Sequence, residues 1–139
     1  MQQPTSETTN SAQASGRTRP EHPLIPAGRV NGTAVFNREG EKLGQVEDVA
    51  IEKVSGRVAY AILSFGGFLG VGERYYPVPW KVLTYDLDRG GYVIPCDKDQ
   101  LENAPSFDTE DLSGWDDTDV RDRVFGYYAP YGAEPYWLG

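Results

Sequence analysis

The sequence has very few of the residues on which most catalytic and metal sites depend. Of its 139 residues, one is cysteine and one is histidine. Cys96 has no second cysteine for an internal disulfide, and a structural zinc site needs several Cys or His ligands. His22 lies in a polar stretch, where a Ser–His or Cys–His mechanism would find no ordered base. The sequence therefore predicts no catalytic residues, no cofactor and no metal site, and favours a protein that is not an enzyme.

Long apolar runs are also missing. No window approaches the roughly 18 consecutive apolar residues of a membrane-spanning helix, so no membrane insertion is expected. The first residues, MQQPTSETTNSAQASG, contain no apolar core of a signal peptide. From this we expect a cytoplasmic location.

The chain also lacks an excess of positive charge. The formal net charge is −8, and it is uneven: residues 1–96 carry ten acidic and ten basic side chains, whereas residues 97–123 carry ten acidic and three basic ones. Nucleic-acid binding needs a basic face that neutralises phosphates, and anionic lipid surfaces attract basic segments. The sequence therefore argues against both kinds of partner.

The most informative stretch in the chain is an apolar run followed by a glycine-rich loop. Residues 58–65 carry apolar or small side chains at both alternating sets of positions, which predicts a strand covered on both faces. Residues 66–72 contain four glycines, Gly66, Gly67, Gly70 and Gly72, and we expect Gly66 or Gly67 to need a positive φ. The apolar tip of this loop, Phe68 and Leu69, must fold back or meet a partner.

Shorter signals predict further strands and turns. Residues 33–36 form a strand before a tight turn that places Gly40 at positive φ. The apolar phase changes within residues 43–52, which predicts a β-bulge near Glu47. Pro77 cannot donate a ladder hydrogen bond, so residues 74–78 are expected at a sheet edge.

The second half of the domain begins with a turn and a hairpin. A helical turn at residues 79–81 would let Trp80, after Pro79, plug one end of the sheet. Residues 82–85 and 92–94 form a hairpin, and Asp97 with Gln100 reads as the capping box of a short helix.

Five motifs together resemble the PRC-barrel family, which is named after the H subunit of photosynthetic reaction centres. They are VNGTAVFN at 30–37, GEKLGQVED at 40–48, GRVAYA at 56–61, FGGFLGVG at 65–72 and PVPW at 77–80. The resemblance covers about residues 26–104. It implies an all-β fold: a small, partly open antiparallel β-barrel with a short C-terminal helix and irregular tails.

The resemblance also implies a class of function. Members of this family serve in assembly, in the reaction-centre H subunit, in a ribosome-maturation factor and in many stand-alone bacterial and archaeal proteins without an assigned role. The family shares no catalytic residues. This chain lacks the membrane helix of the H subunit and the partner domain of the maturation factor, so the stand-alone type is most similar to it.

Composition divides the chain into four parts. Residues 1–23 are expected to be disordered, residues 24–105 form the barrel-like domain, residues 106–123 an acidic linker, and residues 124–139 an aromatic-rich tail. The proline-broken spacing of the tail aromatics fits neither a helix nor a regular strand. Two interpretations fit them equally: they cover the chain's own barrel, or they dock on another chain.

Two functional hypotheses follow. The first is a non-enzymatic protein-interaction module that associates with itself, as a homodimer or small homo-oligomer, or with another protein, because open barrels leave strand edges unpaired. The alternative is a small-ligand or metal-ion binding protein that uses the loop at residues 66–72 or the acidic residues within 108–119. The candidate interaction surface of the first hypothesis comprises Phe68, Leu69, Tyr75, Tyr76, Tyr127, Tyr128, Tyr136 and Trp137, and the residues assigned a structural role are Gly40, Gly66, Gly67, Gly70, Gly72, Pro79 and Trp80.

Overall fold

A computed structural model describes residues 23–65, 74–107 and 118–138 of the chain. Of the segment predicted to be disordered, residues 1–23, all residues except Pro23 lie outside the described residues. The same holds for the glycine loop, with Gly66, Gly67, Phe68, Leu69, Gly70 and Gly72, and for most of the acidic segment.

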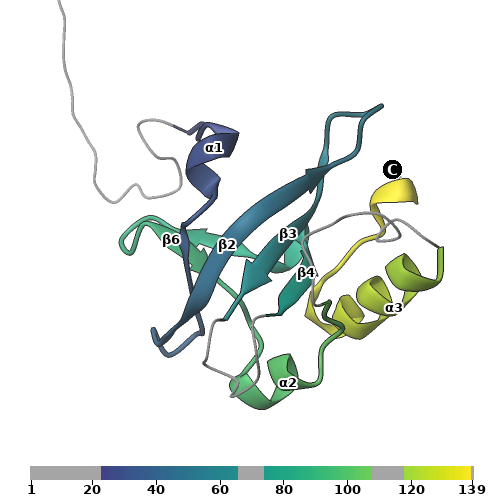
Figure 1. Cartoon of the computed structure of the whole chain (residues 1–139). Helices are drawn as coiled ribbons and strands as arrows, with labels where there is room; N and C mark the ends of the chain where they lie inside the picture. The colour runs from purple at the N-terminus through teal and green to yellow at the C-terminus, as the bar shows by residue number, and fades with distance from the viewer. Residues whose placement is uncertain (1–22, 66–73, 108–117, 139) are drawn as a thin grey trace, which may run out of the picture.

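One strongly bent sheet organises the described residues (Figure 1). Its strand order is β4-β3-β2-β1-β6-β5, so β4 and β5 are the two edges. The strands are β1 (Ala34–Phe36), β2 (Lys42–Ile51), β3 (Val58–Ser64), β4 (Tyr75–Pro79), β5 (Thr84–Asp86) and β6 (Gly91–Val93). Since the edges do not pair with each other in this order, the barrel is partly open, as predicted, and β4 lies at an edge, as Pro77 indicated.

The prediction of an all-β, antiparallel fold was too simple in two respects. Strand β1 pairs with β6 in parallel, with Val35 opposite Tyr92, while the other pairs are antiparallel. Besides the predicted short helix, α2 (Lys98–Glu102), the described residues include the helices α1 (Ala27–Val30) and α3 (Thr118–Tyr128), which were not predicted. Three short 3-10 turns are also present among the described residues: η3 (Trp80–Val82) after β4, and η4 (Ala129–Tyr131) and η5 (Tyr136–Leu138) after α3.

Several local predictions are confirmed. The register between β2 and β3 shifts between Val46 and Asp48, which is the predicted bulge. Gly40 has φ +88° in the turn between β1 and β2. The side chain of Asp97 accepts a hydrogen bond from the Gln100 backbone N–H while the Gln100 side chain accepts one from the Asp97 N–H, so the capping box opens α2.

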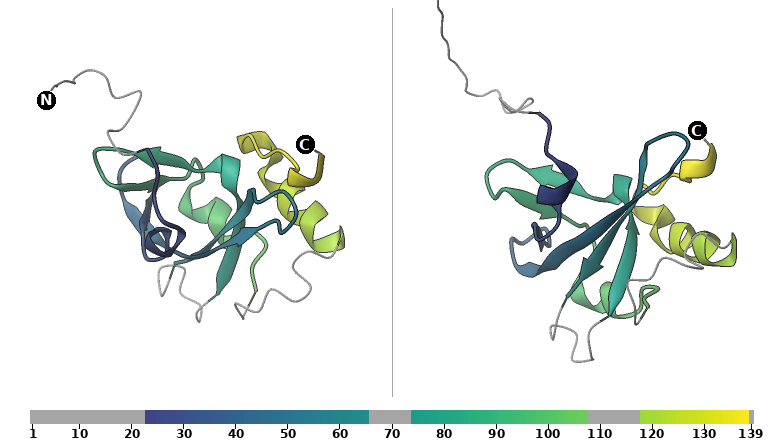
Figure 2. Two further views of the ribbon diagram at one scale, coloured as in Figure 1. Left: turned by 90° about the horizontal axis from the view of Figure 1, so that it is seen from above. Right: turned by 45° about the horizontal axis from the view of Figure 1, so that its top comes forward.

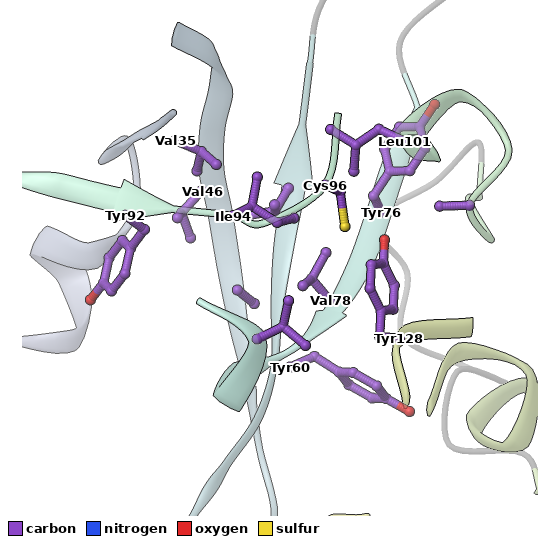
Figure 3. Close-up of a cluster of buried hydrophobic side chains, with 14 of the residues drawn as sticks. Val35, Val46, Tyr60, Tyr76, Val78, Tyr92, Ile94, Cys96, Leu101 and Tyr128 are labelled. Carbon is purple, nitrogen blue, oxygen red and sulfur yellow. The ribbon is translucent and has the colours of Figure 1, made fainter. Parts of the chain in front are cut away.

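The interior of the bent sheet is the hydrophobic core. Six of the seven residues of β3 are buried, in agreement with the prediction of a strand covered on both faces. Figure 3 shows Val46, Val78, Ile94, Cys96 and Leu101 converging in this interior. Trp80 is half-buried, and its ring lies 5.4 Å from that of Tyr92, so it packs against the core at one end.

Helix α3 corrects the prediction that the tail aromatics fit no helix. It crosses the predicted boundary between acidic linker and aromatic tail, and it buries Val124, Phe125 and Tyr128. These residues belong to the same core cluster as the barrel. In all three views α3 and the C-terminal segment lie at the end of the molecule opposite to α1 and the β5–β6 hairpin (Figures 1 and 2). Of the two interpretations of the tail, the chain in this structure adopts the first.

Candidate interaction surface

The edge strand β4 is a poor template for a further strand. The backbone N–H of Tyr75 donates to the Phe107 carbonyl at 2.8 Å, and the Phe107 N–H donates back at 2.9 Å, so the Tyr75 backbone groups point away from β3. Because this direction alternates along an antiparallel strand, Pro77 and Pro79 have the same outward orientation. Neither has an N–H to donate. Proline and a covering segment are two ways in which proteins protect a sheet edge.

The structure separates the eight residues predicted for the interaction surface. Tyr76 and Tyr128 are buried, which corrects their assignment to a surface. Tyr75, Tyr127, Tyr136 and Trp137 are half-buried, and Phe68 and Leu69 lie outside the described residues. Tyr76 faces the core because it lies opposite Leu63 of β3 on the same side of the sheet.

The second edge, β5, is open in the part of the chain that the structure describes. Tyr85 in this strand is 42% exposed, and Leu87 in the turn after it is 38% exposed. The Tyr85 ring packs on Tyr92 of β6 at 5.1 Å, which holds it against the sheet. A shallow, wide-open depression of about 500 Å³ lies at this edge, lined by Thr84, Tyr85, Asp86, Leu87, Asp88 and Val93.

The turn that ends β5 is stabilised by its own hydrogen bonds. The backbone N–H groups of Arg89 and Asp88 donate to the Asp86 carboxylate at 3.1 and 2.9 Å, and the Arg89 guanidinium forms an ion pair with it at 2.8 Å. The hydrogen bond from the Arg89 backbone is the main cause that lowers the pKa of Asp86. The turn therefore holds Leu87 in an exposed position at neutral pH.

Sequence reasoning missed this second edge, although a signal was present. Leu87 is the one apolar side chain in the segment Asp86 to Gly91, which otherwise consists of charged residues and glycine. Apolar residues are exposed elsewhere as well: Leu24, Ile25 and Ile51, and Val54 at the tip of the β2–β3 hairpin, which is 97% exposed. Single exposed apolar residues are common on protein surfaces, so Val54 alone indicates no interface.

Comparison with models of protein families agrees with the architecture of this sheet. The model of the PRC-barrel domain matches residues 24–101, more than half of the chain. The chain belongs to the PRC-barrel family. The match contains all six strands and most of α2, and it ends before α3.

A relative of this PRC barrel is an uncharacterised protein of Deinococcus radiodurans. It is 27% identical over 93 residues, which cover 67% of this chain and 33% of the relative. The chain thus spans about one third of the length of that relative. Nothing about an activity follows from it.

The interior of the PRC barrel contains the one cysteine next to α3. Burial raises the pKa of the Cys96 thiol to about 11, and the neighbouring Asp97 charge acts in the same direction. Burial is also the main cause that raises the pKa of Tyr128, whose hydroxyl points towards Tyr76 and Cys96 in Figure 3. Since the folded thiol holds its proton more tightly than the unfolded one, its contribution to stability is present below about pH 9 and is lost as the pH rises towards 11.

We expect Cys96 to be unreactive in the folded protein. Its pKa of about 11 lies above the usual value of 9.0, so at pH 8 its thiolate fraction is about 100-fold lower than that of a free cysteine, and burial restricts access further. The rate of reaction with a chromogenic disulfide reagent measures this. The same chain in concentrated guanidinium chloride is the control and should react fully. Reaction at equal rates in both conditions would contradict the buried position of Cys96.

The described part of the chain contains neither a membrane-spanning helix nor a cluster of metal-binding side chains. None of the helices in residues 23–65, 74–107 and 118–138 is long and apolar enough to cross a membrane. The same residues include no group of three or more His, Cys, Asp and Glu side chains placed to hold a metal ion.

Proposed function

We propose that this chain is a non-enzymatic protein-interaction module that acts in the cytoplasm and associates with itself through strand β5. The observation that carries the proposal is the contrast between the two sheet edges. Strand β4 has Phe107 and two prolines at its outer side, whereas Tyr85 and Leu87 leave apolar surface exposed at the β5 edge. An uncovered edge strand invites pairing with another strand.

A second copy of β5 is a suitable partner for this edge. Antiparallel pairing of two β5 strands would continue the sheet, and a two-fold axis at Tyr85 would place each Tyr85 opposite its copy. In that register Thr84 would lie opposite Asp86, so the two Asp86 carboxylates would not face each other. Like charges directly opposite destabilise a strand pair, and aromatic pairs stabilise it. A self-complementary patch of this kind closes as a two-fold dimer.

The alternative of ligand or metal binding has no supporting observation. Its two candidate regions, residues 66–72 and the acidic residues 108–117, lie outside the described residues. Asp119 is described and lies in the first turn of α3.

Replacing Leu87 with lysine is expected to shift the chain from dimer to monomer. The new ammonium group would replace apolar surface that the copy covers, and burying a charge in place of an apolar side chain is costly. We expect the dimer to weaken at least about tenfold, which corresponds to roughly 1.4 kcal/mol. Light scattering over a series of protein concentrations measures the change.

The matched control is Val54→Lys, which adds the same charge to an exposed apolar residue at the far end of the β2–β3 hairpin. It should leave the mass unchanged. A wild-type chain that is monomeric at high concentration would refute self-association. A dimer that both variants weaken equally would remove β5 from the interface and indicate a general effect of charge.

A further inference from the structure

The C-terminal segment, residues 118–138, packs on the barrel in the manner of a bound peptide. It follows the family match, which ends at residue 101, and ten residues of sequence separate it from Phe107. Apart from the bonds within its helices, its backbone hydrogen bonds among the described residues run from Gly132 to Ala129 and from Ala133 to Tyr128, both within the segment. The segment is therefore held to the barrel mainly by side chains.

Three aromatic side chains anchor the segment. The Phe125 ring lies 5.5 Å from that of Tyr60, and Tyr136 contacts the same Tyr60 ring at 6.0 Å. The Tyr128 side chain is fully buried beside Tyr76 and Cys96 (Figure 3). We call the barrel residues Tyr60, Tyr76 and Cys96 the α3-binding face. A helix that inserts apolar anchors at neighbouring positions into a groove is a recurrent mode of peptide recognition.

The fit between the segment and the barrel is incomplete. The buried Tyr128 hydroxyl has no hydrogen-bond partner among the described residues, and leaving such a group unpaired is unfavourable. A cavity of about 120 Å³ lies between the segment and the barrel, and its lining includes Trp80 and Lys81 of the barrel and Glu134 and Tyr136 of the segment. At its rim Lys81 and Glu134 form an ion pair at 2.6 Å in which both side chains are mostly exposed. Exposed ion pairs contribute little to stability, so this pair holds the segment on the barrel only weakly.

An isolated helix of the length of α3 is marginal in water, so α3 depends on its contacts with the barrel. We propose that the C-terminal segment is a detachable ligand of its own barrel. The α3-binding face that it leaves accepts the C-terminal segment of a second copy of the chain. The segment of a second chain has the same residues and therefore fits the face equally well. Exchange of identical segments between two chains is a low-cost route to a dimer. The face is separate from the β5 edge, so this inference does not depend on the proposed function.

The exchange has a measurable consequence for a peptide added in solution. A labelled peptide of residues 118–139 must compete with the chain's own segment, so its apparent Kd equals the intrinsic Kd divided by the fraction of chains with an open face. Any substitution that weakens the internal segment should therefore strengthen binding of the unchanged peptide.

The central test titrates this peptide into the full-length chain and follows fluorescence anisotropy. The full-length variant Phe125→Ala loses one anchor of the internal segment while the α3-binding face stays intact. We expect it to bind the wild-type peptide at least about tenfold more tightly than the wild-type chain does. The peptide that carries Phe125→Ala itself should bind about tenfold more weakly to either chain.

A second variant keeps the test valid if Phe125→Ala does not fold. Glu134→Lys changes an exposed side chain and replaces the contact with Lys81 by repulsion. It should raise the affinity for the peptide by about two- to fivefold. The control Leu87→Lys alters the β5 edge and should leave peptide binding unchanged, which separates this inference from the proposed function.

Equal affinity of the peptide for the wild-type, Phe125→Ala and Glu134→Lys chains would overturn the proposal, as would equal binding of the wild-type and Phe125→Ala peptides. Tighter binding of the wild-type peptide to both chain variants than to the wild-type chain, together with weaker binding of the altered peptide than of the wild-type peptide to every chain, supports it.

Discussion

Replacing Gly44 with alanine is expected to destabilise the protein by at least about 3 kcal/mol. An ideal Cβ at this position in β2 would overlap the Ser64 carbonyl oxygen and lie 2.9 Å from the Phe65 Cα, and both are backbone atoms that cannot rotate away. The β2–β3 ladder would have to separate at this point. Chemical denaturation followed by circular dichroism measures the loss of stability.

Gly126→Ala is the matched control for this substitution. Gly126 lies inside α3, and a Cβ added there would meet no atom of the described residues within 4 Å beyond its chain neighbours and the backbone of its own helix. Alanine favours a helix over glycine by roughly 0.5–1 kcal/mol, so the control should be neutral or stabilising. A Gly44→Ala variant as stable as the Gly126→Ala variant would show that β2 and β3 do not approach each other so closely.

Replacing Leu63 with alanine should lower the free energy of unfolding by about 2–5 kcal/mol. Leu63 lies in β3, is fully buried, and faces Val46 of β2 and Tyr76 of β4 in the sheet register. The loss combines the removed apolar contacts with the cavity that the flanking strands cannot fill. Urea denaturation of the variant and of the wild-type chain measures the difference.

The control for Leu63 is Val54→Ala at the exposed tip of the β2–β3 hairpin. Surface substitutions of this kind usually change stability by less than about 0.5 kcal/mol. Two variants with equal denaturation midpoints would contradict the buried position of Leu63.

Features of this protein that depend only on residues close together in the sequence could be predicted from the sequence. Pro77 placed β4 at an edge because proline has no N–H, the change of apolar phase near Glu47 located the bulge, and the Asp97 and Gln100 pair located the start of α2. Gly40 is similar, because a tight turn requires a positive φ there. In each case a steric or hydrogen-bonding rule acts within a few residues, so the local sequence is sufficient.

Helix α3 depends both on its local sequence and on tertiary contacts. Val120, Val124, Tyr127 and Tyr128 follow the i, i+4, i+7, i+8 spacing of a helical face, and this signal was available in the sequence. Gly126 and the prolines at 130 and 135 obscured it. The helix becomes stable only where the barrel offers Tyr60 and Tyr76 as a surface to cover, and that surface exists only after folding.

The tertiary structure decided which aromatic side chains are buried, and it made β5 an open edge of the sheet. Tyr76 and Tyr85 each lie in a short edge strand, yet Tyr76 lies in the core and Tyr85 on the surface. The parallel pairing of β1 with β6 brings together residues almost sixty positions apart, Val35 and Tyr92. Such contacts depend on how the whole sheet bends and closes, because the free energy of burial belongs to the assembled core and not to any one segment.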